Sequence, residues 1–209
     1  MYPYQNDSQQ PPMDMTPMPA LHETPPQEGQ SLRQRSSGLF REVFQTALLV
    51  IILYTGLNLF IPRYIVEGHS MEPSFYDHER IVVSRLHYIL GDPQRGDVVV
   101  LDLDNQIDLL KRIVALPGET VTMDEGQIFI NGVALDEPYV AELCQTYSCQ
   151  DRQWVLGDDE YFVLGDNRNH SRDSHDFGPI KRSQIIGKVL MKYWPPSDWS
   201  WISGQDYTD

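Results

Sequence analysis

The stretch DLLKRIVALPGE, residues 108–119, is typical of a β-strand that ends in a tight turn. Successive side chains of a strand point to opposite faces of the sheet. The alternation puts Leu109, Lys111, Ile113 and Ala115 on one face, and Leu110, Arg112, Val114 and Leu116 on the other. Both faces are largely apolar, which is typical of a strand buried on both sides. The sequence therefore predicts a buried strand that carries one basic side chain on each face.

The rest of residues 63–209 has the same β character. Short runs rich in valine, isoleucine and leucine alternate with turn signals that contain glycine, proline, asparagine and aspartate. The segment QIFINGVAL, residues 127–135, is a hairpin candidate because Asn131–Gly132 supplies the positive φ angles of a tight turn. No long amphipathic helix is expected after residue 62. We expect a mainly β fold, an antiparallel β-sheet domain.

Lys111 is the candidate general base on the buried strand. Burial of a charged ammonium group is unfavourable and lowers the pKa of lysine. A shift from ~10.4 to ~7.4 corresponds to about 4 kcal/mol and would leave the amine ready to accept a proton near neutral pH. Arg112 cannot do this because arginine stays protonated. The alternatives are that Lys111 extends to solvent or pairs with the nearby Asp108.

A candidate nucleophile, Ser70, lies in the stretch VEGHSMEPS, residues 66–74. His69 comes directly before it, but neighbouring side chains of an extended chain point to opposite faces. We therefore expect His69 to face solvent, and the group that takes the Ser70 proton has to come from elsewhere in the sequence.

An uncharged apolar run from Val43 to Ile61 is long enough to cross a bilayer. Its 19 residues span ~29 Å as a helix at ~1.5 Å each. A buried helix of a soluble domain rarely lacks all charge over this length, and PRYIVEG follows where a cleavable signal peptide needs small residues. We predict a transmembrane anchor over residues 38–62. The preceding residues 1–37, rich in proline and glutamine, are predicted to be a disordered tail.

Charges on the two sides of this run predict its orientation. Arg33, Arg35 and Arg41 precede it, and only Arg63 follows closely. The positive-inside rule then places the N-terminus in the cytoplasm and the remainder across a plasma or thylakoid membrane.

Residues 63–209 hold 13 Lys+Arg and 25 Asp+Glu, a net charge of −12, so we expect no nucleic-acid partner.

Two cysteines, Cys144 and Cys149, lie in the exported part with four residues between them. In an oxidising compartment they could form a small-loop disulfide, and two free thiols are the alternative. Two cysteines alone cannot complete a structural zinc site. The carboxylates Asp102, Asp104 and Asp108 do not match the spacing of a calcium loop. We expect neither a metal nor a cofactor.

Four segments occur in order behind the anchor: GHSMEPSF (68–75), RGDVVVL (95–101), LLKRIVALPGE (109–119) and GDNRNHSRDSHDFGPI (165–180). Together they resemble bacterial type I signal peptidases, in particular the Gram-positive, cyanobacterial and plastid branch. These are membrane-bound serine proteases with a Ser–Lys dyad. The resemblance covers roughly residues 39–194. It implies a mainly antiparallel β fold whose apolar surface lies against the membrane. It also implies removal of signal peptides from exported precursors after Ala-x-Ala sites.

The resemblance also implies roles for individual residues. Ser70 would be the nucleophile, Lys111 the general base, and Ser171 the residue that hydrogen-bonds and orients the lysine amine. Asp173 would belong to a structural polar network close to the site. Shallow apolar pockets for the small substrate residues are implied as well, and we expect them to be lined by Tyr64, Val66, Met71 and Leu110.

The chain departs from the family pattern at two positions near this site. Gly68 stands where some relatives have a serine that donates a second hydrogen bond to the oxyanion, so the second donor is open. His175 stands where an arginine often forms an ion pair, and a histidine pairing there would be weaker at neutral pH and pH-dependent.

Three tryptophans near the C-terminus, Trp194, Trp199 and Trp201, favour either the bilayer interface or a position capping the core. Two other functions compete with that of a protease. Self-cleaving repressors use a Ser–Lys dyad but cut an Ala-Gly bond, and this chain has no Ala-Gly dipeptide. A catalytically silent, membrane-anchored β domain that binds exported peptides would be expected to lack part of the candidate Ser–Lys–Ser set, all of which is present.

Overall fold

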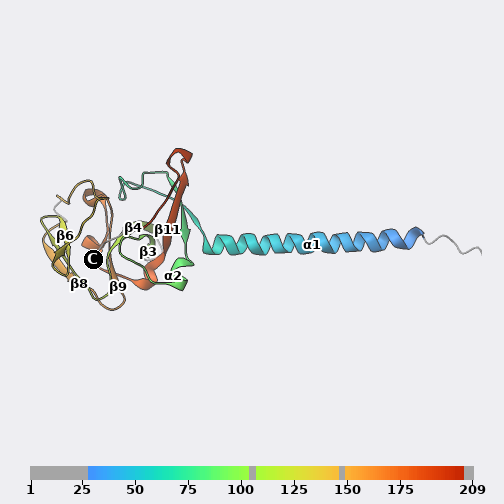
Figure 1. Ribbon diagram of the computed structural model, residues 1–209, viewed down its shortest axis with the longest axis horizontal. Helices are drawn as coiled ribbons and strands as arrows, with labels where there is room; N and C mark the ends of the chain where they lie inside the picture. Colours follow the sequence, from blue (N-terminus) through green and yellow to red (C-terminus); the bar gives the residue numbers. More distant parts are fainter. Residues whose placement is uncertain (1–27, 104–106, 146–148, 205–209) are drawn as a thin grey trace, which may run out of the picture. The chain divides into compact units, whose positions relative to one another are not determined.

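The computed structural model describes residues 28–103, 107–145 and 149–204. The chain divides into two compact units, residues 1–48 and 49–209. One long helix, α1 (Glu28–Phe60), precedes the strands (Figure 1). Within it, Phe40–Phe60 is apolar and long enough to cross a membrane, with a mean hydropathy of 1.9.

The helix begins ten residues before the expected start of the anchor. Residues 28–37, predicted to belong to the disordered tail, are helical. No proline occurs between Pro26 and Pro62, so nothing interrupts a helix over this length. Residues 28–37 also contain glutamine, leucine and arginine, which favour helix. The helix ends shortly before Pro62, as the restriction on residues preceding proline predicts. The rest of the predicted tail, residues 1–27, lies outside the described residues.

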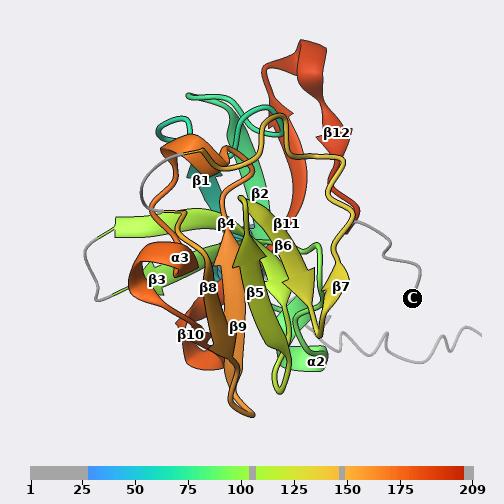
Figure 2. The ribbon, with the colours of Figure 1, turned by 90° about the vertical axis from the view of Figure 1, so that its left-hand side faces the viewer.

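The strands form two antiparallel sheets, which confirms the predicted mainly β fold. The main sheet has the order β1-β2-β11-β3-β4-β9-β10, with β12 paired to β11. Its strands are β1 (Arg63–Ile65), β2 (Arg80–Ser84), β3 (Val98–Leu103), β4 (Ile107–Ala115), β9 (Glu160–Leu164), β10 (Ile180–Lys181), β11 (Ile185–Trp194) and β12 (Ser200–Trp201). The second sheet has the order β7-β6-β5-β8 (Figure 2). Its strands are β5 (Thr120–Asp124), β6 (Gln127–Ile130), β7 (Val133–Ala134) and β8 (Arg152–Val155).

Short helices connect some of these strands. They are the α-helices α2 (His87–Leu90) and α3 (Ser174–Phe177), and the 3₁₀ turns η1 (Arg168–His170), η2 (Arg182–Gln184) and η3 (Pro196–Asp198). The predicted hairpin is confirmed between β6 and β7, where Ile130 pairs with Val133. Asn131 and Gly132 have φ angles of 52° and 85°, the left-handed conformation that such a turn requires.

Strand β4 lies inside the main sheet, between β3 and β9. Its two basic residues are buried, with Lys111 2% and Arg112 6% exposed, as the sequence predicted. The predicted alternation fails at the end of the strand, where the pairing with β9 shifts register between Ile113 and Ala115. Ala115 lies in the apolar cluster of Val114, and Leu116 packs against the cluster that contains Ile113.

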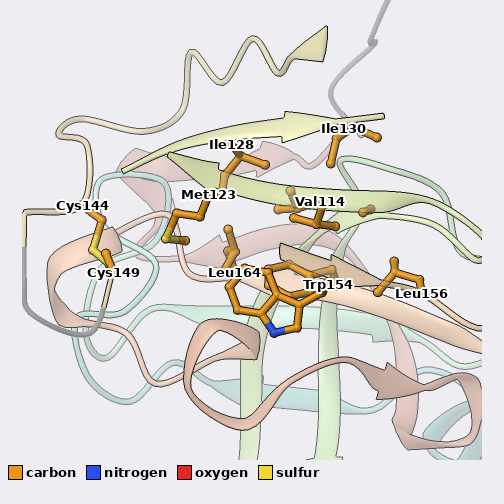
Figure 3. Close-up of a cluster of buried hydrophobic side chains, with 12 residues drawn as sticks. Val114, Met123, Ile128, Ile130, Cys144, Cys149, Trp154, Leu156 and Leu164 are labelled. Atoms are coloured by element: carbon orange, nitrogen blue, oxygen red, sulfur yellow. A yellow bond between two sulfur atoms is a disulfide. The ribbon is translucent and has the colours of Figure 1, made fainter. Parts of the chain in front are cut away.

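The two sheets share an apolar cluster, shown in Figure 3, in which Trp154 of β8 and Leu164 of β9 lie close to Met123 and Ile128 of the smaller sheet. Cys144 and Cys149 lie at the edge of this cluster and form a disulfide, so the free-thiol alternative is wrong. The disulfide thereby links two side chains that are both buried beside the core.

The three C-terminal tryptophans do not cap the core. Trp194, Trp199 and Trp201 are 48%, 52% and 65% exposed, and the rings of Trp199 and Trp201 contact each other edge to face. The alternative that these tryptophans cap the core is therefore wrong, and their position at the bilayer interface stays a prediction.

Candidate active site

Ser70 and Lys111 meet although 41 residues separate them in the chain. Nζ of Lys111 lies 2.8 Å from Oγ of Ser70 and 2.8 Å from the carbonyl oxygen of Leu110. A neutral amine fits both contacts, because it can accept the serine proton through its lone pair and donate an N–H to the carbonyl. The pair has the geometry of a nucleophile and its base.

Burial lowers the pKa of Lys111 from 10.5 to about 8, and the negative charges of Asp173 and Asp166 oppose this only in part. Among the described residues, no carboxylate lies within ion-pair distance of its amine. Asp108, the alternative partner, is exposed. Lys111 neither extends to solvent nor pairs with Asp108. At a pKa of about 8, about one tenth of the amine is neutral at pH 7 and about half at pH 8.

The turn that carries Ser70 is held by backbone contacts. Gly68 has a φ of 89°, and its N–H donates to Oδ1 of Asp77 at 2.9 Å. Asn167 fixes the next two residues, donating from its backbone N–H to the Ser70 carbonyl and from Nδ2 to the His69 carbonyl, both at 3.1 Å. The Gly68 N–H is thus engaged and is not the missing second oxyanion donor. Sequence reasoning missed Asn167, although it lies in the GDNR motif.

His69 faces solvent, as expected. Its side chain is 65% exposed, and Nδ1 lies 2.8 Å from Oε1 of Glu72. The histidine beside the nucleophile is therefore paired with a carboxylate and not with the Ser70 hydroxyl.

Ser171 lies near the Ser70 carbonyl, and its buried hydroxyl makes no hydrogen bond to any described residue. The expected hydrogen bond from Ser171 to the Lys111 amine is therefore not formed, since that amine contacts Ser70 and the Leu110 carbonyl. Gly165 explains the close approach: a Cβ at this position would clash with the Ser171 hydroxyl and with the Ser70 carbonyl oxygen. The need for glycine here was not recognised from the sequence. A buried hydroxyl without a partner is unfavourable, and its retention next to Ser70 points to a role in the reaction.

Asp173 organises the segment that carries Ser171. Its carboxylate is fully buried, accepts from the Gly165 N–H at 2.8 Å, and lies 2.5 Å from Nδ1 of His175. Burial lowers the pKa of His175, but the hydrogen bond to Asp173 and the charges of Asp173 and Asp176 outweigh it, and the net pKa is raised. The raised pKa of His175 favours the protonated form of the histidine, and thus an ionic pair with Asp173.

Arg112 ties the Lys111 strand to the same loop. It binds Asp166 through two hydrogen bonds of 2.8 and 2.6 Å, donates to the Gly96 carbonyl at 3.0 Å, and stacks on the Tyr139 ring. Such bidentate pairs fix orientation as well as distance. Residues 165–171 and β4 are thereby held together, which places the neighbouring Lys111 against Ser70.

A cleft of about 520 Å³ opens beside the dyad. All four predicted pocket residues line it, together with both members of the dyad: Tyr64, Val66, Met71, Leu110, Ser70 and Lys111. Sequence reasoning did not identify further lining residues, among them Ile65, Ile81, Val100 and Leu109. Strand β1 lies at one wall of the cleft; among the described strands it pairs only with β2 and is the terminal strand of the main sheet. Glu67, Asp102 and Asp108 also line the cleft, so its wall is part apolar and part acidic. A free strand edge next to such a cleft can bind an extended peptide.

Comparison with known proteins gives consistent matches. The family described as signal peptidase, peptidase S26, matches residues 39–194. A probable signal peptidase I-2 of Synechocystis sp. is 34% identical over 163 residues, which cover 74% of this chain and 73% of the relative. Signal peptidase I of Leptolyngbya laminosa is 33% identical over 83% of this chain and 89% of the relative.

Two further matches have similar identities. Signal peptidase IB of Staphylococcus aureus (strain MRSA252) is 31% identical over 78% of this chain and 93% of the relative. A crystal structure of a signal peptidase I from Enterococcus faecalis V583 is 34% identical, covers 47% of this chain and 97% of that one, and superposes with a TM-score of 0.42.

Proposed function

The chain belongs to the signal peptidase family, peptidase S26, and we infer that it is a signal peptidase I with Ser70 as its nucleophile and Lys111 as its general base. A signal peptidase I is a serine endopeptidase that cleaves signal peptides from secreted precursors. The observation that carries the assignment of the dyad is the 2.8 Å contact between Nζ of Lys111 and Oγ of Ser70, made by a buried amine.

The geometry supports a single amine that acts first as base and then as acid. Neutral Lys111 accepts the Ser70 proton while the serine oxygen attacks the scissile carbonyl, and the resulting ammonium protonates the leaving amine. The same amine then takes a proton from the water that hydrolyses the acyl-enzyme. The backbone N–H of Ser70 is the first donor to the tetrahedral oxyanion.

Cleavage of a precursor with an Ala-x-Ala site tests this function. Purified wild-type protein should release the mature product, and Ser70→Ala should lower the rate by about a thousandfold or more, because the covalent step is lost. Ser74→Ala, in the same turn, is the matched control and should retain activity. The Ser74 hydroxyl accepts a long hydrogen bond from Nη2 of Arg112 at 3.4 Å and is not hydrogen-bonded to the Lys111 amine. Equal rates for wild type and Ser70→Ala would favour the silent peptide-binding domain.

Substrate selection follows from the cleft. The signal peptide would extend along the free edge of β1, with backbone hydrogen bonds that supply affinity. Its two small residues before the cut would then face the apolar lining formed by Tyr64, Val66, Met71 and Leu110. Shallow pockets at these side chains would fit alanine and exclude large residues.

Ser171 is assigned as a positioning residue for the Lys111 amine. Ser171→Ala should lower kcat by about ten- to hundredfold, because a misoriented base loses effective proximity, and should leave KM unchanged. Ser174→Ala is the control: this buried hydroxyl accepts from the Val163 N–H at 3.0 Å, so its loss should reduce stability by about 1 kcal/mol without lowering kcat. If Ser171→Ala lowered stability and left kcat unaltered, the orienting role would be wrong.

The apolar part of α1 would anchor the enzyme in the membrane in which its precursors are embedded, which raises their effective concentration. We place the N-terminal residues in the cytoplasm and residues 63–209 on the opposite side, at a plasma or thylakoid membrane. In sealed vesicles with the cytoplasmic face outward, added protease should remove only the residues before the anchor. Degradation of the β domain in intact vesicles would reverse this orientation.

A further inference from the structure

The segment that follows β7 brings two side chains of the smaller sheet's connection to the candidate active site. Strands β7 and β8 lie at opposite edges of the smaller sheet, so the chain between them has to cross from one edge to the other (Figure 2). In this segment, Glu137 and Tyr139 each contact an arginine of the motifs that hold the dyad. We call these two side chains the bridge.

Glu137 fixes the bridge to the loop of residues 165–171. Its carboxylate accepts hydrogen bonds of 2.9 and 2.5 Å from the guanidinium of Arg168, and both side chains are buried. Asn167, the neighbour of Arg168, donates from its backbone N–H to the Ser70 carbonyl. Glu137 therefore holds the part of the loop that in turn holds the nucleophile.

Tyr139 extends the bridge to β4. Its hydroxyl donates to Oε1 of Glu137 at 2.7 Å, and its ring centre lies 4.1 Å from Cζ of Arg112. The same guanidinium makes the two hydrogen bonds to Asp166. A ring that covers one face of a guanidinium restricts its plane and keeps water from the ion pair, which strengthens the pair. The tyrosine thus supports the bidentate geometry between β4 and the loop.

These contacts connect β4 and the loop by two routes. Arg112 binds the loop directly through Asp166, and Tyr139 and Glu137 bind it a second time through Arg168. Two connections at different points of the loop restrict rotation as well as separation. Since Lys111 is the chain neighbour of Arg112, a shift of this part of β4 would move the amine relative to the Ser70 hydroxyl.

From this arrangement we propose that Tyr139 is a positioning residue for the dyad, held by Glu137 and acting through Arg112. Tyr139 is not among the residues that line the 520 Å³ cleft, so its effect is on the base and not on the substrate. It also lies outside the four segments that carry the family resemblance. The proposal rests on the Ser70–Lys111 chemistry proposed above.

Two substitutions at position 139 test the proposal in the full-length protein in detergent. Tyr139→Leu removes the ring and should lower kcat for an Ala-x-Ala precursor by about tenfold with KM unchanged, because a displaced base loses proximity while the cleft is intact. Tyr139→Phe keeps the ring on Arg112 and should lose less, about twofold to threefold. A Tyr139→Leu protein with wild-type kcat, or with a change in KM alone, would overturn the proposal.

Tyr88 provides the matched control, because it makes the same two kinds of contact elsewhere in the domain. Its hydroxyl donates to the buried carboxylate of Asp97 at 2.9 Å, and Cζ of Arg182 lies 5.1 Å from its ring centre. Tyr88 does not line the cleft either. Tyr88→Leu should therefore lower stability at least as much as Tyr139→Leu and leave kcat unchanged; Tyr88→Phe is the control for Tyr139→Phe.

The route through Arg112 is tested by combining substitutions. In an Arg112→Met background, Tyr139→Leu should lower kcat by less than about twofold, because the residue through which it acts is already absent. Arg112→Met/Asp166→Leu is the background to use where the single variant does not fold. Equal fold-losses of kcat in the wild-type and substituted backgrounds would contradict this route.

A readout without turnover separates this proposal from the proposed function. In protein labelled with ¹³C at lysine Cε, Tyr139→Leu should shift the Lys111 signal and Tyr88→Leu should not. An unchanged Lys111 signal in Tyr139→Leu would refute the positioning role even if the wild type cleaves the precursor. A wild type that does not cleave the precursor would refute the proposed function, while the Lys111 signal would still decide whether Tyr139 positions the amine.

Discussion

Replacing Lys111 with methionine is expected to abolish precursor cleavage and to increase the stability of the folded protein. The rate should fall by about ten-thousandfold or more, the loss that serine proteases suffer when their base is removed. Most losses of a buried hydrogen-bonding group destabilise a protein, so the combination of inactivity with a gain in stability would be diagnostic.

The gain in stability has a defined pH dependence. The pKa of Lys111 is about 8 in the folded protein, below the ordinary value of 10.5. Below pH 8 the amine is protonated in both states, and the buried charge lowers the free energy of unfolding by about 3 kcal/mol. This cost decreases as the pH rises from 8 to 10.5 and vanishes above that range. Urea unfolding in detergent at pH 6 and pH 10.5 should therefore show that Lys111→Met stabilises the protein mainly at the lower pH.

Lys192→Met is the matched control for this substitution. Lys192 is also buried, but its amine lies 2.9 Å from the carboxylate of Glu79, which is itself 3% exposed. Removing the lysine leaves a buried carboxylate unpaired, which should destabilise the protein by about 3–5 kcal/mol. Opposite effects of the two substitutions would show that Lys111 differs from a structural lysine. Destabilisation by Lys111→Met at pH 6 would contradict the account.

Arg112→Met is expected to have the second largest effect, on stability and on activity together. The substitution leaves the buried carboxylate of Asp166 without its bidentate partner, which should cost about 3–5 kcal/mol in the free energy of unfolding. Activity should fall as well, even where the protein is still folded, because β4 and the loop that contains Ser171 are no longer fixed to each other.

Two comparisons make this prediction specific. Arg95→Met removes an arginine from the partly exposed pair with Glu119 and should cost less, about 1 kcal/mol. Arg112→Met combined with Asp166→Leu should recover part of the lost stability, since no charge stays buried alone. If the double variant recovered stability but not activity, the Arg112–Asp166 ion pair would be shown to position β4 against the loop that contains Ser171. An Arg112→Met protein as stable as wild type would show that the pair is not structural.

Much of this site could be predicted because its chemistry is encoded locally. The alternation in β4 predicted two buried basic residues, and the chemical difference between lysine and arginine made Lys111 the candidate base, with solvent exposure and pairing with Asp108 as alternatives. The roles of Ser70, Lys111 and Ser171 were predicted from the family resemblance. The Asn131–Gly132 turn was predictable for the same reason, since its backbone conformation depends on two adjacent residues.

The features that the sequence did not reveal depend on distant segments meeting in space. Arg112 and Asp166 are 54 residues apart, and only the folded chain shows that they pair. The need for glycine at position 165 arises from Ser70 and Ser171, which approach it from different segments. The irregular pairing that redirects Ala115 is likewise set by the neighbouring strand β9 and not by the residues of β4.

The most direct test of the central claim is an NMR titration of the Lys111 side chain in the full-length protein in detergent. The chain has only four lysines, so ¹³C labelling at Cε gives few signals, and Lys111→Met identifies the relevant one. The account predicts a midpoint near pH 8, with a neutral amine above it. A midpoint at the ordinary value of 10.5 would contradict it, because the amine would then be protonated at the pH where the enzyme has to act.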